Sequence, residues 1–139
     1  ITSYAPLLPA SQQEDYYHFL KAKWHYSNQQ FDASMRHLAT VQFTDLFLNL
    51  DAKLLLMKIY YERTEFAALD SLLSSTQRFL QRQKMMSYHK QNYTNTVLYI
   101  KKLVETNLYD ADKRESLSQK IQNTSPIGEK QWLLQMLEK

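Results

Sequence analysis

The chain has 139 residues, a formal net charge of +3, one glycine, three prolines and no cysteine. This length fits one domain with a single core, and the few Gly and Pro residues leave little room for tight turns, which favours an all-α fold. The lack of cysteine excludes disulfides, thiolate metal sites and cysteine nucleophiles, and no apolar run approaches the ~20 residues that cross a bilayer.

The first elements expected are an extended lead-in over residues 1–10 and a helix over about 11–28. Pro6 and Pro9 favour extended backbone in the lead-in, and Ser11 begins a capping-box pattern. The helix is expected to bury apolar side chains that recur at three- and four-residue steps. This stripe comprises Tyr17, Leu20 and Trp24, with Ala22 and His25 beside them.

A polar turn at 27–30 precedes a second helix, expected over about 31–41. Its buried face is predicted to carry Phe31, Ser34, Leu38 and Val41, which share one side of a helix. The two helices would form a first hairpin over about 11–42.

A second hairpin is expected over about 47–83. Its first helix, over about 48–62, would bury apolar residues around Leu55 and Ile59. After the turn at 63–65, the partner helix would reach about residue 83. Its predicted buried face comprises Phe66, Leu69, Leu73, Thr76 and Leu80.

A third hairpin is expected over about 88–123, followed by a terminal helix over about 126–138. The hairpin's first helix, over 88–106, would bury Tyr88, Val97, Ile100 and Val104. Ser125 followed by Pro126 is a favourable helix start. The terminal helix would cap the third hairpin with Trp132, Leu133, Met136 and Leu137.

Two segments of the chain match each other at a spacing of thirty-five residues. Ala22, Phe31 and Leu38 then fall on Met57, Phe66 and Leu73, while His25-Tyr26 falls on Tyr60-Tyr61. A third unit matches more loosely at a spacing of forty-eight. A repeat of roughly 34 residues is typical of helix pairs that stack into a solenoid.

These residues resemble the tetratricopeptide-repeat family in a divergent form. Ala22 with Ser34, Leu38 and Val41, and then Met57 with its partners, take the family's places for contacts within each pair. The family's usual Gly is replaced at both places, and its Pro between units is absent near Leu46. The resemblance implies an all-α, right-handed α-α superhelix of about three hairpins and a C-terminal capping helix, in one domain over 11–139.

The resemblance also implies a groove, lined by the first helix of each pair, that binds a protein or peptide segment or mediates self-association. Its lysines could attract an acidic partner, although the asparagines of the family's carboxylate clamps are missing. The alternative is that Tyr26 and Tyr61 only pack within the array and the lysines are solvated. By repeat position the candidates are Tyr16, Phe19, Lys23 and Tyr26, then Asp51, Leu54, Lys58 and Tyr61, then Tyr99, Lys102, Thr106 and Tyr109.

Other chemistries find less support in the sequence. Glu14, His18 and His25 share a helix side but lack a further cluster to complete a metal shell, and His37 and His89 have no evident partners. No strained nucleophile turn or phosphate-binding loop is present, so neither catalysis nor a cofactor is expected.

The alternatives to protein binding are nucleic-acid binding by the basic surface between Arg78 and Lys102, and a spacer for an upstream domain. The first needs basic side chains on phosphates and Tyr88 and Tyr93 stacked on bases. Dispersed charge makes it the weaker hypothesis. The closing stretch over 120–134 is similar to the tail of bacterial helical-repeat proteins of the Bacteroidetes type. That similarity, and the absence of an initiator Met at Ile1, suggest a fragment whose missing part lies upstream.

Overall fold

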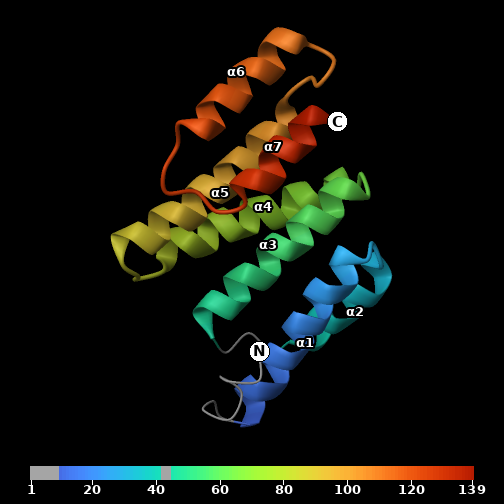
Figure 1. Cartoon of the computed structure of the whole chain (residues 1–139). Helices are drawn as coiled ribbons and strands as arrows, with labels where there is room; N and C mark the ends of the chain where they lie inside the picture. Colours follow the sequence, from blue (N-terminus) through green and yellow to red (C-terminus); the bar gives the residue numbers. More distant parts are fainter. Residues whose placement is uncertain (1–9, 42–44) are drawn as a thin grey trace. The chain divides into compact units, whose positions relative to one another are not determined.

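The structure, a computed structural model, describes residues 10–41 and 45–139. These residues form seven helices and no strand (Figure 1), which confirms the predicted all-α fold. They divide into two compact units with the boundary between Glu65 and Phe66. The right-handed superhelix and the single repeat domain remain predictions, and the predicted lead-in lies outside the described residues except for Ala10.

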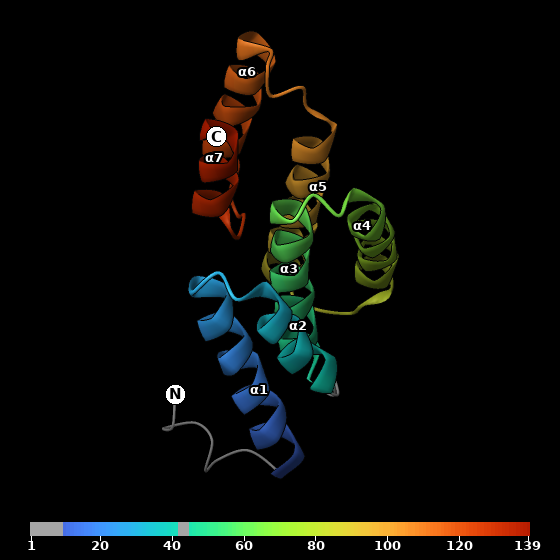
Figure 2. The same ribbon diagram turned by 90° about the vertical axis from the view of Figure 1, so that its right-hand side faces the viewer.

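Unit 1 contains three helices that all contact one another: α1 (Ala10–Ser27), α2 (Phe31–Thr40) and α3 (Leu46–Glu62). Helices α1 and α2 lie side by side in both views (Figure 1 and Figure 2). Helix α1 starts one residue before the predicted cap at Ser11. Helix α3 starts two residues early because the Asp45 carboxylate accepts from Phe47 N at 2.8 Å and Leu48 N at 3.3 Å.

The core of unit 1 forms where α1 faces its two neighbours. The predicted stripe on α1 is wrong for Tyr17 and Trp24, which are 54% and 57% exposed, and it is confirmed for Ala22, which is fully buried. Asp15 and Phe19, which were not part of the predicted stripe, are also buried, and Phe19 and Ala22 belong to one core cluster with residues of α2 and α3. The predicted face of α2 is confirmed from Ser34 onward. The core cluster comprises Phe19, Ala22, Leu38, Val41, Leu48, Ala52, Leu55 and Ile59.

Helices α1 and α3 end in the same way. Gln30 N–H donates to His25 O at 2.8 Å and Glu65 N–H donates to Tyr60 O at 2.9 Å, thirty-five residues apart. The residues before them, Gln29 and Thr64, have positive φ angles of 58° and 55°. This is the hydrogen-bond pattern of the Schellman motif, in which a left-handed residue ends the helix. The likeness concerns these two turns, and the wider repeat stays a prediction.

Unit 2 contains α4 (Phe66–Arg82), α5 (Ser87–Glu105), α6 (Ala111–Gln122) and α7 (Lys130–Glu138). Helix α5 contacts the other three helices, and α6 also contacts α7. The predicted buried face of α4 is confirmed except for Phe66, which is 41% exposed. Tyr88, predicted as buried, is 64% exposed. Both residues lie in the first turn of their helices, before the first buried residue of each helix.

The terminal helix starts later than expected. The predicted start at Ser125-Pro126 is wrong, because α7 begins at Lys130. The intervening loop is held against α5: Asn95 Nδ2 donates to Pro126 O at 2.9 Å, and Gly128 N–H donates to Thr96 Oγ1 at 2.8 Å. These bonds to α5 hold residues 126–128 in a loop, where the cap pattern predicted the first turn of a helix. The predicted apolar stripe is confirmed, since Trp132, Leu133, Met136 and Leu137 are all buried.

Candidate functional site

A pocket of about 310 Å³ lies between α1 and the start of α3. Three of the predicted groove residues, Tyr16, Phe19 and Lys23, line it from α1. The groove prediction also placed Asp51 beside them, and it lines the pocket from α3. Asp45 and Phe47, which the sequence did not single out, also line the pocket. The structure therefore brings the first predicted groove residues together around one cavity.

The pocket combines aromatic surface with both signs of charge. Phe19 is only 9% exposed, whereas Phe47 is 42% exposed. Lys23 Nζ lies 5.6 Å from the centre of the Phe19 ring, within the range of a cation–π contact. The Asp45 carboxylate is already engaged as the cap of α3. A ligand with an apolar side chain next to a charged group would fit the chemistry of this pocket.

A second group of predicted residues lies on α1 and α3 and is tied together by polar contacts. The Tyr26 hydroxyl donates to the Glu62 carboxylate, and Lys58 Nζ lies 4.8 Å from the centre of the Tyr26 ring. Tyr26 also packs on Phe31. Burial raises the pKa of Tyr61 above its ordinary value. In this part of the site, Tyr26 contributes to packing rather than to open surface.

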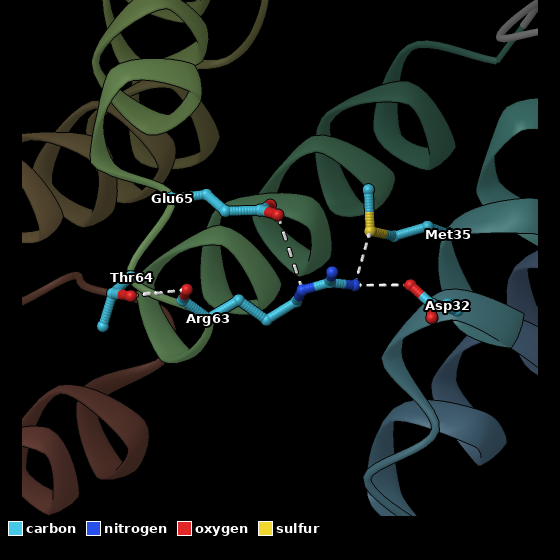
Figure 3. A network of polar contacts seen from close by, with 5 residues as sticks. All are labelled: Asp32, Met35, Arg63, Thr64 and Glu65. Carbon is cyan, nitrogen blue, oxygen red and sulfur yellow. Dashed lines mark hydrogen bonds and ion pairs between the residues drawn. The ribbon is translucent and has the colours of Figure 1, made fainter.

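An ionic network joins the first turn of α2 to the C-terminus of α3 (Figure 3). Arg63 Nη1 lies 2.6 Å from Asp32 Oδ1, and Arg63 Nε lies 3.5 Å from Glu65 Oε1. The hydrogen bond from Arg63 and its positive charge lower the pKa of Asp32. Sequence reasoning missed this pair because thirty-one residues separate its members and no helical spacing relates them.

The remaining predicted residues do not join these two groups. Leu54 is 7% exposed and offers little surface. Lys102 lies in unit 2, where it lines a separate cavity of about 310 Å³ between α5 and α6. Tyr109 is 98% exposed in the loop between these helices. The continuation of the predicted groove into unit 2 thus stays a prediction.

Three histidines meet on the α1–α2 surface. The Nδ1 atoms of His18 and His37 are 2.9 Å apart, and the rings of His25 and His37 stack with centroids 5.3 Å apart. The expectation that His37 has no partner is therefore wrong, because helix packing brings it to two residues of α1. Burial, followed by the charges of His18 and His25, lowers the pKa of His37. Within the described parts of the chain, no group of three or more acidic or histidine side chains has a metal-binding arrangement.

The basic residues proposed for nucleic acid lie on α4, on α5 and in the loop between them. Arg78, Arg82 and Lys84 are exposed. Lys90 Nζ, however, donates to the carbonyl oxygens of Gln81 and Gln83, at 3.5 and 3.2 Å. Tyr93 is 8% exposed and is not open for stacking on a base.

Comparison of the chain with protein-family models, curated proteins and solved structures gave no match. Of the helices in the described residues, none has the length and apolar character needed to span a membrane.

Proposed function

We propose that this chain is a non-catalytic, tetratricopeptide-like interaction module that holds a segment of another protein in the pocket between α1 and α3. The observation that carries this proposal is the shared cavity around Tyr16, Phe19 and Lys23. Tyr and Phe side chains supply large contact areas, and they are enriched in protein interfaces. The pocket residues sit on two helices that pack against each other, so binding would order little of the scaffold.

The expected ligand is a peptide segment with an apolar anchor and a carboxylate near it. The anchor would contact Phe19 and Phe47, and the carboxylate would pair with Lys23. Asp51, on the other side of the pocket, would favour a partner whose positive charge lies farther along the segment.

A photo-crosslinking experiment tests this surface with a matched control. Phe47 and Phe66 have nearly equal exposure, 42% and 41%, but only Phe47 lines the pocket. A benzophenone amino acid would replace each in turn, and adducts would be captured from a cell extract. A protein adduct at position 47 that is missing at position 66 is the expected result, and mass spectrometry would define the crosslinked peptide.

The identified peptide would then be titrated against purified chain variants. Lys21 and Lys23 are both exposed on α1, and their Nζ atoms lie 5.7 and 5.6 Å from aromatic ring centres. Only Lys23 lines the pocket, so Lys23→Glu should weaken binding about tenfold and Lys21→Glu should not.

In the crosslinking experiment, equal adducts at positions 47 and 66, or none at either, would instead favour the spacer hypothesis. An adduct with nucleic acid would favour the basic-surface hypothesis.

A further inference from the structure

Charge is unevenly distributed along this chain. Residues 71–104 contain no Asp or Glu but carry six of the 17 Lys and Arg residues. The other eleven basic residues accompany all 14 acidic residues, so the rest of the chain has a formal charge of −3. The segment comprises most of α4, the connecting loop and nearly all of α5. The modest net charge of the chain therefore conceals one strongly basic helix pair.

The basic pair ends in a surface with both cationic and apolar side chains. Helices α4 and α5 pack on each other and are joined by a short loop at one end of the pair (Figure 1). Met86 in this loop is 73% exposed, and Tyr88 in the first turn of α5 is 64% exposed. We define the α4–α5 tip as these two residues with Arg78, Arg82 and Lys84, which are all exposed.

The cations of the tip are not neutralised by neighbouring side chains. Among the described residues, none forms an ion pair with Arg78, Arg82 or Lys84. Arg78 and Arg82 are four residues apart on α4, so they project from the same side of the helix. Lys84 follows in the loop, next to the exposed apolar residues. The tip thus presents three cations beside a small apolar surface.

The make-up of the tip favours a lipid surface over a nucleic acid. Binding to a single strand normally uses several aromatic rings on which successive bases stack. Tyr93 is buried and Lys90 is bonded to backbone carbonyls, so Tyr88 is the one exposed tyrosine of this surface and Lys90 is engaged within the fold. Met86 offers no ring for stacking. A flexible apolar side chain and a tyrosine suit the interface between lipid headgroups and acyl chains.

We propose that the α4–α5 tip docks on membranes that contain anionic phospholipids. Arg78, Arg82 and Lys84 would be attracted to the negative surface potential, which acts within about 10 Å at moderate ionic strength. Met86 and Tyr88 would enter the headgroup region. No acidic residue within 71–104 opposes this approach. The tip shares no residue with the α1–α3 pocket, and the inference does not depend on the proposed function.

Vesicle flotation with the whole chain tests this inference. Vesicles of phosphatidylcholine alone would be compared with vesicles of equal parts phosphatidylcholine and phosphatidylserine, at low and high salt. The chain should float only with the anionic vesicles, and added salt should weaken binding. The triple variant Arg78→Glu, Arg82→Glu, Lys84→Glu should lower the partition coefficient by about tenfold or more.

Two further variants test whether binding depends on the residues of the tip or only on the net charge of the chain. The variant Lys113→Glu, Lys120→Glu, Lys139→Glu changes the net charge equally at exposed positions outside the tip, and it should retain most of the binding. Met86→Ser with Tyr88→Ser should weaken the binding that persists at high salt. Circular dichroism would confirm that each variant is folded.

Three outcomes would overturn the proposal. The chain could fail to float with anionic vesicles, or the two triple variants could lose binding equally, which would show a general charge effect. The third outcome is displacement from vesicles by an oligothymidine strand that also binds the tip in the absence of lipid, which would assign the surface to nucleic acid.

Discussion

The helix pair α1–α2 in unit 1 and the helix pair α4–α5 in unit 2 are held together differently. In α1–α2 the Ser34 hydroxyl donates to the backbone carbonyl of Ala22 at 2.7 Å, and this bond between the two helices is buried. In α4–α5, Lys90 of α5 reaches the carbonyl oxygens at the end of α4, close to the loop. The Thr76 hydroxyl, buried within α4, has no hydrogen-bond partner among the described residues.

The polar contacts of the two pairs differ because the buried side chains of the two pairs differ in size. Ala22 has no exposed surface, and a serine hydroxyl can reach its carbonyl only when the two helices approach closely. The buried residues of α4 and α5 are mostly larger than alanine, among them Leu73, Val97 and Ile100. The first pair should therefore be sensitive to added volume, and the second pair should be sensitive to its buried polar group.

The largest effect is expected from adding volume between α1 and α2. Ala22→Leu should lower the free energy of unfolding by about 1–3 kcal/mol, because the new side chain has no space at a fully buried position. Urea unfolding followed by circular dichroism would measure it. Ala67→Leu, at an exposed position of α4, is the control and should change stability by less than about 0.5 kcal/mol. Equal effects would contradict the proposed close approach.

The next effects should have opposite signs in the two pairs. Thr76→Val removes a buried hydroxyl without a partner and should raise the free energy of unfolding by about 1 kcal/mol. Ser34→Ala removes the bond to Ala22 and should lower it by a similar amount, about 1 kcal/mol. The same urea experiment would measure both. A loss of stability in Thr76→Val would indicate that its hydroxyl is satisfied in solution, for example by a bound water.

A smaller and more local effect is expected at the loop of the α4–α5 pair. Lys90→Met keeps the length of the side chain but removes the bonds to Gln81 O and Gln83 O. It should lower the free energy of unfolding by about 0.5 kcal/mol. Hydrogen exchange should speed up at the end of α4 and leave the α1–α2 pair unchanged. Lys101→Met, at an exposed position of α5, is the matched control and should alter neither quantity.

Acid should weaken the α1–α2 pair. The pKa of His37 is lowered from 6.5 by burial and by His18, His25, Lys21 and Arg36, in that order. The unfolded chain therefore binds the proton more readily, so stability is highest above pH 6.5 and falls as the pH drops toward the lower folded pKa. The effect should be modest, because His37 is only partly buried.

Urea unfolding across this pH range would measure the effect, and hydrogen exchange would locate it. His37→Gln should flatten the profile. The same profile in wild type and His37→Gln would assign the acid sensitivity to groups other than His37.

Much of the helix pattern could be predicted, since periodicity and turn residues located all seven helices. The errors arose where tertiary contacts compete with local preference. Ser125-Pro126 has a favourable cap pattern, but Thr96 and Asn95 of α5 hold the following loop. Tyr17 and Trp24 have apolar spacing, yet α1 packs through Phe19 and Ala22.

The candidate site was predictable only in part. The repeat positions brought Tyr16, Phe19 and Lys23 to one pocket, because residues three and four apart share a side of a helix. Phe47 was missed, since it lies in the first turn of α3, where periodicity does not distinguish a pocket from open surface.

The amino-acid sequence by itself determined the all-α character, the approximate helix ends and the basic character of residues 71–104. These properties follow from local periodicity, capping and charge, which act within a few residues. Only the tertiary structure decided that Arg63 meets Asp32, that three histidines converge and that Lys90 is bonded to the end of α4. Such contacts join residues distant in the chain or on different helices, and they depend on how each helix is rotated about its axis when it packs.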